Sequence, residues 1–464
     1  MRIALINEGT YPYGSGALGT WCEQLVRGLD EHAFWLVNLV EGRPAVASAL
    51  PPNVARLTTI ARAGRSVFPD GGPVSREAAI RQHRRLATHA AVLLCRGMVD
   101  DGAPSAAMFR TGLRRLTGLA ADGTHPLVGV PLGPVLLDAW RAGAGSGLPR
   151  PTIADAENAA MLLERAVRPL AARLPDLDLC HVVHSGGSVL VALAHRWRNG
   201  VPYVLTEHDG YGTDPLLAAA TGYPEVQAVL HRFLRALTRL GNAEASAVTP
   251  PDERMRQWAL RHDADPAVIR VVPPGLDPYD HPPLREEPTE PVLAWLGEPA
   301  ELPVALAAFD QVRRAVPDAR LIVIGAAPDG GPRPVGVNFS GPVTGYRALF
   351  GKAGVVAMSG GLARMPYPLL EAMFCGRATV CTDLGGLDAM VGAGARTVPP
   401  GDPAALAAAC VPLLTDVPQR RALGAAAREL ARTRFRLDTM LDSYREVYPQ
   451  ATASAPAERL AGLR

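Results

Sequence analysis

The chain has 464 residues, about three times the length of a typical single domain, so two or three domains are expected. Hydrophobic residues make up 48% and charged residues 20%, which suits large buried cores and excludes a disordered chain. The 47 basic and 45 acidic residues give a formal net charge of +2 without a basic run, which argues against nucleic acid as a partner.

The cysteines and the apolar runs indicate the cellular compartment in which the protein is expected. Six cysteines are scattered without zinc-like spacing, which favours a reducing compartment over a disulfide framework and predicts no metal. The first apolar run reaches only Ile6, which is short for a signal peptide. No apolar stretch approaches the length of a membrane span, so a cytoplasmic protein is expected.

Short apolar runs alternate with longer helical patterns in residues 1–280. The predicted strands are Arg2–Asn7, Phe34–Val40, Leu179–His184, Tyr203–Thr206, Ala245–Thr249 and Ile269–Val272. Most are continuous Val, Ile and Leu runs, typical of parallel strands buried on both faces. Helical patterns between them, such as Glu225–Leu240, predict a doubly wound, Rossmann-like α/β domain. From about 60 to 175 helical patterns dominate, which indicates a helical insertion in this domain.

The alternation restarts after a proline-rich stretch that ends at Pro291. The further predicted strands are Val292–Leu296, Leu321–Ile324, Gly354–Met358, Ala378–Cys381 and Thr397–Val398. Residues 281–435 are therefore predicted to form a second doubly wound domain with a parallel sheet, and 436–464 a C-terminal helix and tail.

A glycine-rich segment, Gly14–Gly19, matches G-x-G-x-x-G between the first strand and a helix. Thr20 and Glu23 have the spacing of a capping box. The motif suggests a dinucleotide site, and a carboxylate at Glu41 after the second strand keeps an NAD(P)-dependent oxidoreductase open. In that fingerprint, however, the first glycine follows the strand directly, whereas residues 8–13 intervene here. A plain turn before a helix is the remaining interpretation.

Two carboxylates mark the second domain. Glu371 lies near the start of the predicted helix Tyr367–Phe374, where a negative charge stabilises the helix itself. Because ligands bind at the carboxyl ends of parallel strands, Glu371 is also a candidate to accept hydrogen bonds from a ribose. Asp383 precedes Gly385 and Gly386, and is either a turn former or a ligand contact.

Several segments together resemble a known family. They are Glu8–Tyr13 with the glycine segment and Trp21, then Thr206–His208, Val248–Pro250, Ile269–Asp277, Leu369–Met373 and Thr382–Gly386. They resemble the family 4 retaining glycosyltransferases of the GT-B fold, and the N-terminal block resembles the Pel exopolysaccharide glycosyltransferase subgroup.

The resemblance implies a function. The first domain would hold a glycan or exopolysaccharide acceptor, and the second a nucleoside-diphosphate sugar, UDP-glucose in the most similar relatives. Transfer would proceed with retention and without a metal or other cofactor, the sugar nucleotide being a co-substrate. A membrane-associated synthase complex and an active paralogue are the protein partners that the resemblance leaves open.

The resemblance also assigns roles to residues. His208 would lie near the reacting centre and Glu371 would hold the donor, these two being the catalytic candidates. The remaining donor-binding candidates are Gly16, Arg364, Asp383, Gly385 and Gly386. Arg364 is included because a guanidinium can clamp a diphosphate.

Three positions depart from the family pattern. The first of its paired glutamates would fall at Ala363, and its basic pair at Glu298 and Pro303. A carboxylate about 4 Å from a phosphate would repel it by several kcal/mol at an intermediate dielectric. A catalytically impaired, glycosyltransferase-like binding or scaffold subunit is therefore a second hypothesis.

Overall fold

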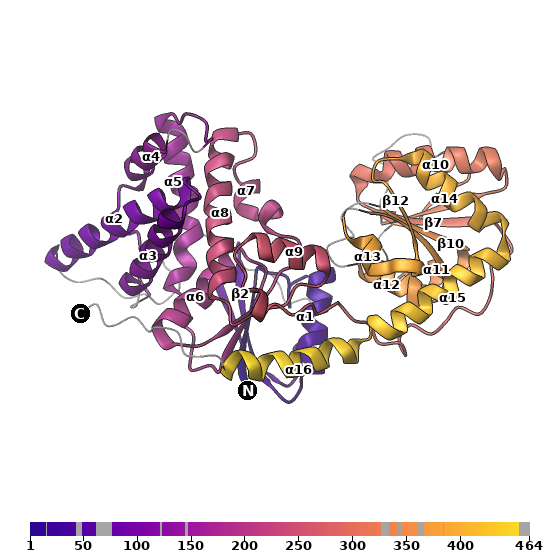
Figure 1. The fold of residues 1–464 in the computed structure, drawn as a ribbon, viewed down its shortest axis with the longest axis horizontal. Coiled ribbons are helices and arrows are strands. Elements are labelled where there is room, and N and C mark those ends of the chain that lie inside the picture. Colours follow the sequence, from indigo (N-terminus) through magenta and orange to yellow (C-terminus); the bar gives the residue numbers. More distant parts are fainter. Residues whose placement is uncertain are drawn as a thin grey trace. The chain divides into compact units, whose positions relative to one another are not determined.

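The computed structural model describes residues 1–453 apart from Ser15, 43–48, 62–76, 121–122, 144–146, 326–333, 342, 344, 360–365 and 384. The chain forms two compact units (Figure 1). Unit 1 comprises Met1–Pro251, Met255–Val271 and the chain from Tyr444 on, and unit 2 comprises Asp252–Arg254 and Val272–Ser443. Each is an α/β unit around one parallel sheet, as the alternating pattern predicts.

The sheet of unit 1 has the strand order β3-β2-β1-β4-β5-β6 with every pair parallel. The strands are β1 (Arg2–Asn7), β2 (Ala33–Val40), β3 (Val54–Ala61), β4 (Leu179–Val183), β5 (Tyr203–Thr206) and β6 (Ala247–Val248). Strand order reverses between β1 and β4, and open sheets of this kind bind ligands beyond the carboxyl ends of the strands at such a point.

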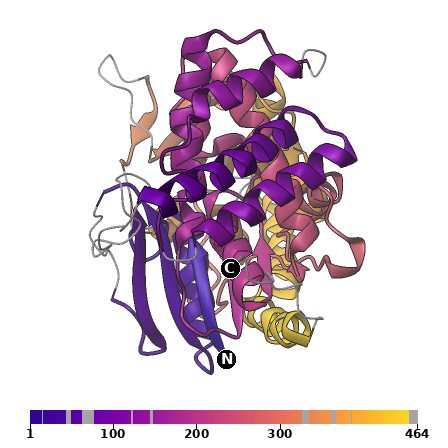
Figure 2. The ribbon, with the colours of Figure 1, turned by 90° about the vertical axis from the view of Figure 1, so that its left-hand side faces the viewer.

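Helices cover this sheet, and four of them form the predicted insertion on one side (Figures 1 and 2). The helices are α1 (Ala17–Gly28), α2 (Glu77–Val99), α3 (Ala103–Leu119), α4 (Leu132–Ala142), α5 (Ile153–Val167), α6 (Gly187–Asn199), α7 (Pro215–Ala218), α8 (Pro224–Glu244) and α9 (Glu253–Arg261). Within the insertion, α2 and α3 approach closely because Gly97 and Gly112 have no side chains. A Cβ at Gly97 would lie 2.3 Å from the Phe109 nitrogen.

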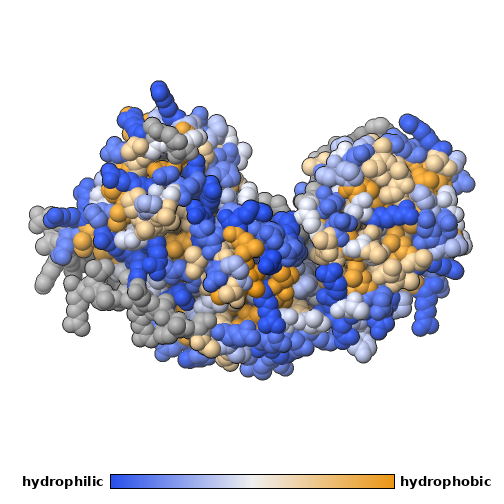
Figure 3. All heavy atoms as spheres, in the orientation of Figure 1, coloured by the Kyte–Doolittle hydropathy of each residue, from blue (hydrophilic) through white to orange (hydrophobic). Residues whose placement is uncertain are grey.

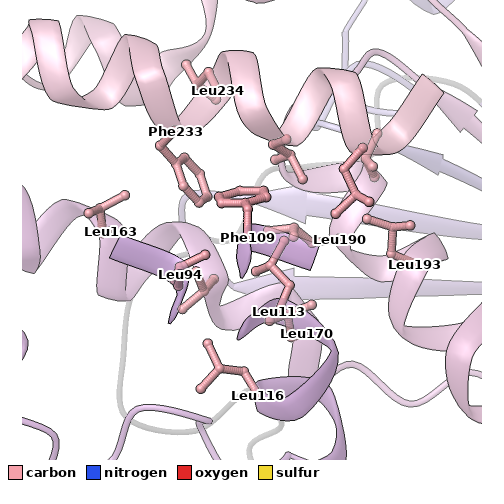
Figure 4. Close-up of a cluster of buried hydrophobic side chains, with 14 of the residues drawn as sticks. Leu94, Phe109, Leu113, Leu116, Leu163, Leu170, Leu190, Leu193, Phe233 and Leu234 are labelled. Atoms are coloured by element: carbon pink, nitrogen blue, oxygen red, sulfur yellow. The ribbon is translucent and has the colours of Figure 1, made fainter. Parts of the chain in front are cut away.

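The insertion shares the hydrophobic core of the sheet. The Phe109 ring on α3 meets the Phe233 ring on α8 edge-on, with centroids 5.9 Å apart (Figure 4). Leu190 on α6 and Leu163 on α5 belong to the same buried cluster. The insertion is therefore packed into unit 1 through the helices that cover the sheet.

Unit 2 repeats the topology, with order β12-β11-β10-β7-β8-β9 and every pair parallel. Its strands are β7 (Val292–Gly297), β8 (Arg320–Ile324), β9 (Val337–Phe339), β10 (Val355–Ser359), β11 (Ala378–Thr382) and β12 (Arg396–Val398). Its helices are α10 (Leu302–Ala315), α11 (Arg347–Lys352), α12 (Tyr367–Phe374), α13 (Leu387–Val391), α14 (Pro403–Thr415) and α15 (Val417–Arg434). Here strand order reverses between β7 and β10.

The last helix, α16 (Leu437–Ala453), begins in unit 2 and ends in unit 1. Its Tyr448 hydroxyl lies 2.8 Å from Nδ1 of His181, and Tyr444 lies 3.2 Å from the Thr206 hydroxyl. The Thr206 hydroxyl is also 2.7 Å from Nε2 of His181. Burial lowers the pKa of His181 to about 3, so the ring stays neutral at physiological pH. This network ties the end of the chain to β4 and β5.

Local details differ from expectation. Ile269–Val272 forms only an isolated bridge from Ile269 to Val248 and is not a strand. The capping box at Thr20 and Glu23 was also wrong, because α1 begins at Ala17 with Gly16 as its N-cap and no side-chain cap.

The length and apolarity of the helices decide whether any of them could cross a membrane. Over the described residues, no helix combines the length and apolarity that crossing a membrane requires. On the visible face of each unit, hydrophilic side chains are interspersed with apolar ones (Figure 3).

Candidate functional site

A buried carboxylate, Glu207, joins two loops at the carboxyl end of the sheet in unit 1. Its Oε1 accepts hydrogen bonds from the backbone amides of His208 and Gly210, both at 3.0 Å. Its Oε2 accepts from the Ser185 amide at 2.8 Å and from the Ser185 hydroxyl. These loops follow β5 and β4, so Glu207 fixes the backbone close to the point where strand order reverses.

His184 forms an ion pair with Glu207. Its Nδ1 lies 3.0 Å from Oε1 of Glu207 and 3.5 Å from Oδ1 of Asp209. Burial alone would lower the pKa of His184, but Glu207 outweighs it, with Glu8 and Asp209 adding to the effect, and raises that pKa to about 10. Burial alone would raise the pKa of Glu207, but the charge and hydrogen bond of His184 hold it well below its usual range. Both groups are therefore charged at neutral pH.

The same cluster can be tested as a metal site. His184, Glu207 and Asp209 place one ligand atom each within 4.8 Å of one another. The hydrogen bonds that Glu207 accepts occupy its lone pairs, and a metal would have to displace them. A histidine must also be neutral to ligate, whereas the raised pKa keeps His184 protonated. The cluster fits a buried ion pair and not a metal centre.

More carboxylates lie beside this pair. Oε1 of Glu8, which follows β1, accepts from the Ser188 amide at 3.1 Å and the Ser188 hydroxyl at 3.0 Å. A Cβ at Gly186 would lie 2.5 Å from Oδ2 of Asp214 and 2.6 Å from Oε1 of Glu8. A side chain at Gly186 would force at least one of these two carboxylates to move. We refer to Glu8, Glu207, Asp209 and Asp214 as the acidic edge of unit 1.

The predicted catalytic residue His208 lies directly after Glu207. Its side chain is 4% exposed, and neither ring nitrogen has a hydrogen-bond partner in the described part of the chain. The ring meets Trp21 edge-on with centroids 5.2 Å apart. Burial lowers the pKa of His208 to about 4, so it is a neutral imidazole with unused hydrogen-bonding capacity. Its role at the reacting centre stays a prediction.

The glycine segment does not meet the geometry of a dinucleotide site. Residues 8–16 separate β1 from α1, whereas the oxidoreductase hypothesis requires a glycine directly on the strand end. A Cβ at Gly19 would lie 2.4 Å from the Gly14 carbonyl oxygen, so Gly19 is needed for close packing of the segment on its own helix. Gly16, a donor-binding candidate, has open space where its Cβ would be. Glu41 lies just past β2 and is exposed.

In unit 2, Glu371 lies on α12, which follows β10 in the chain. Its carboxylate is partly buried and has no hydrogen-bond or ion-pair partner among the described residues. Burial raises the pKa of Glu371 to about 7. The pKa of Tyr346 is also raised, mainly by burial and in part by the nearby charge of Glu371. A half-buried carboxylate without donors is costly unless a ligand supplies them.

The other donor-binding candidates of unit 2 differ in what the structure shows of them. Oδ1 of Asp383 accepts from the amides of Gly385 at 2.9 Å and Leu387 at 3.0 Å, so Asp383 acts as a turn former. Gly385 and Gly386 have φ of 95° and 109°, which favours glycine at both positions. Arg364 lies outside the described residues.

Two further charged groups lie near the second sheet. Arg347 donates to the Pro282 carbonyl and lies 3.5 Å from the sulfur of Cys375, so its guanidinium already has contacts. Glu298 follows β7 and is exposed, at the side of the sheet where strand order reverses. A carboxylate thus stands beside the expected ligand position of this unit.

Sequence reasoning missed His184, Ser185 and Asp214. The predicted strand ran through His184, whereas β4 ends at Val183 and His184 takes a φ of 80°. The sequence held a signal for His184 and Ser185, because they lie at the end of a predicted parallel strand, and residues in that position meet at one edge of the sheet. The partner of His184, Glu207, is distant in sequence, so only the strand order reveals the pair.

Comparisons with known protein families give a match in each of the two units. Residues 1–267 match the family described as "Domain of unknown function (DUF3492)", and residues 290–416 match "Glycosyl transferases group 1". A D-inositol 3-phosphate glycosyltransferase from Segniliparus rotundus is 30% identical over 224 residues, 42% of this chain and 48% of that protein. The chain thus spans about half the length of this curated relative.

Solved structures show the fold. Sucrose-phosphate synthase from Thermosynechococcus elongatus superposes with a TM-score of 0.58 at 15% identity, covering 98% of this chain and 100% of the other. Anabaena HepE in complex with UDP and glucose superposes with a TM-score of 0.56 at 14% identity, covering 97% and 99%. The chain belongs to the DUF3492 family and joins that domain to a glycosyl transferases group 1 domain on a GT-B glycosyltransferase fold.

Proposed function

We propose that this protein is a retaining hexosyltransferase of family 4 that moves glucose from UDP-glucose to a hydroxyl of a glycan or exopolysaccharide acceptor. The group 1 match over residues 290–416 supports the reaction class. HepE, which shares the fold, has been solved with UDP and with UDP-glucose, and this supports the donor. The six buried, unpaired cysteines fit a cytoplasmic location.

The observation that carries the proposal is the carboxylate of Glu371, which has no hydrogen-bond or ion-pair partner in the part of the chain that the structure describes. It stands after a parallel strand, in the unit that matches group 1 glycosyl transferases, and its pKa is raised to about 7 by burial. A ribose offers two adjacent hydroxyl donors, which would satisfy both the charge and the hydrogen-bonding capacity of this group. A uridine nucleotide bound there would extend its diphosphate toward the turn at Asp383.

In this proposal, unit 1 supplies the acceptor side. The acidic edge marks the carboxyl end of the sheet, where an acceptor would bind, and the His184–Glu207 pair holds the two loops rigid. His208 would hydrogen-bond the reacting sugar through a nitrogen that is unsatisfied in the free protein. Arg364 would supply the cation that stabilises the leaving diphosphate, an electrostatic form of catalysis.

One observation favours a second candidate function. Glu298 is exposed after β7, and Pro303 stands in the first turn of α10, where relatives would carry basic residues. A negative charge there opposes a diphosphate. The second candidate is a catalytically impaired binding or scaffold subunit, which would keep the fold but transfer no sugar. Such a subunit would pair with an active paralogue or a membrane-associated synthase complex.

Titration calorimetry of the whole protein with UDP, UDP-glucose and NAD tests the proposal, followed by an assay of sugar release and transfer. Glu371→Gln should weaken UDP binding by about 1–3 kcal/mol, roughly five- to 150-fold. The control is Glu429→Gln, the same change at an exposed position on α15, which should leave affinity unchanged.

The pH dependence sharpens this test. Because only the ionised carboxylate accepts from both hydroxyls, wild-type affinity should rise as pH increases through about 7 and then level off. Glu371→Gln should lose that rise. Failure of both uridine ligands to bind at millimolar concentration would remove the donor assignment, binding without turnover would favour the scaffold hypothesis, and NAD binding would favour the oxidoreductase.

A further inference from the structure

Unit 1 contains a cavity that the function proposed above does not use. It lies among α5, α6, α7 and α8 beside the end of β2, and its volume is about 140 Å³. Apolar side chains make up most of its lining, among them Leu39, Leu162, Leu190, Phe233, Leu234 and Leu237. Leu190, Phe233 and Leu234 also belong to the packed core in Figure 4, so the inner wall is part of the rigid fold.

The mouth of the cavity is polar and opens beside the acidic edge. Asp214 lines both, and Glu41 and Arg165 are exposed members of the lining. Gly187 forms part of the wall, and a Cβ there would lie 2.9 Å from Leu39 and 3.6 Å from Oε1 of Glu8. The apolar wall and the carboxylate of Glu8 are thus separated by a single glycine.

The size and charge of the cavity define its ligand. A cavity of about 150 Å³ lined by Leu, Ile and Phe holds a benzene molecule, so this one suits one ring or a branched alkyl group of about six to eight carbons. Two carboxylates, Glu41 and Asp214, and one guanidinium, Arg165, stand in the lining, with Glu8 close by. This excess of negative charge disfavours a phosphate or carboxylate on the bound group.

We propose that this cavity binds the apolar part of an uncharged acceptor, a glycan that carries an aryl or branched-alkyl group next to the hydroxyls to be glycosylated. Burying a phenyl-sized group would contribute binding free energy through its apolar area. The hydroxyls of the same molecule would then reach the acidic edge. The inference names the acceptor class and therefore rests on the proposed transferase function, although the cavity's preference for an apolar group can be measured by itself.

The test uses p-cresol as the probe and the whole protein. Ala218 and Ala219 are exposed neighbours at the end of α7, but only Ala219 lines the cavity. Ala219→Phe should fill the space and weaken p-cresol binding at least tenfold, and Ala218→Phe should leave it unchanged. Binding is measured by saturation-transfer NMR titration, with glycerol as a polar ligand of similar size.

Each outcome decides the inference. Saturable p-cresol binding that is lost in Ala219→Phe and kept in Ala218→Phe supports it. It is overturned by no saturable p-cresol binding to the wild type, by equal binding to both variants, or by glycerol binding as tightly as p-cresol. Both variants are also titrated with UDP, so loss of the donor site and loss of the cavity ligand are read separately.

Discussion

Replacing Glu207 with glutamine would remove the charge that holds two loops of unit 1 together. His184, whose side chain is 14% exposed, would lose its nearer counter-ion and keep Asp209 at 3.5 Å. The amides of Ser185, His208 and Gly210 would lose a charged acceptor. The rise in the pKa of His184 from 6.5 to about 10 corresponds to roughly 3–5 kcal/mol, at about 1.4 kcal/mol for each pKa unit. Breaking a buried ion pair by removing one partner costs a similar amount, about 3–5 kcal/mol.

The pH dependence follows from the two shifts. The pKa of His184 is raised on folding, so its contribution is complete below pH 6.5 and is lost as pH rises toward 10. The pKa of Glu207 is lowered, so its contribution is complete above about pH 4.5 and is lost as pH falls below that value. The difference between wild type and Glu207→Gln should therefore be largest between about pH 4.5 and 6.5, and shrink as pH rises further.

Tryptophan fluorescence in a urea titration measures this difference. Five of the six tryptophans lie in unit 1, so the signal reports mainly on its unfolding. The control is Glu23→Gln, which removes the exposed Glu23–Arg27 pair and should cost under about 1 kcal/mol. A loss below about 1 kcal/mol for Glu207→Gln at pH 6, or a loss that stays constant from pH 6.5 to 9, would refute the reasoning.

Two further substitutions test the packing of unit 1 in the same assay. Gly19→Ala should destabilise the protein by about 1–3 kcal/mol because its Cβ would lie 2.4 Å from the Gly14 carbonyl, and Gly16→Ala, with open space, should cost under about 1 kcal/mol; equal costs would contradict this account. Tyr448→Phe should cost about 1–3 kcal/mol because it leaves Nδ1 of His181 buried without its partner. Tyr223→Phe, at a side chain that is 54% exposed, should cost almost no stability. A similar loss of stability in both tyrosine variants would show that the hydrogen bond from Tyr448 to His181 does not stabilise unit 1.

The strands that were predicted correctly are those buried on both faces. β1, β4, β7 and β10 are continuous apolar runs, and such runs identify parallel strands without further information. β3 was missed because it lies at the edge of its sheet and most of its residues are partly or fully exposed. Its mixed composition carries no strand signal, and its place is fixed by pairing with β2.

The candidate site was only partly predictable, for a different reason. Glu371, His208 and Asp383 were selected through motifs, and each follows a strand of a parallel sheet. The pairing of His184 with Glu207 depends on β4 and β5 being neighbours, and on a backbone turn at His184 that ends β4 early. That Glu371 lacks a partner among the described residues is likewise a property of the packed structure, because it depends on which side chains fold against α12.

The course of α16 sets the limits of any fragment meant to fold alone. The match to DUF3492 ends at residue 267, yet the fold of unit 1 also includes the chain from Tyr444 on. A shortened protein cut after that match would lack Tyr444 and Tyr448 beside β4 and β5 and would leave Nδ1 of His181 without its partner. A fragment meant to fold as unit 1 should therefore include α16, joined through a linker, so that Tyr444 and Tyr448 can pack against β4 and β5 again.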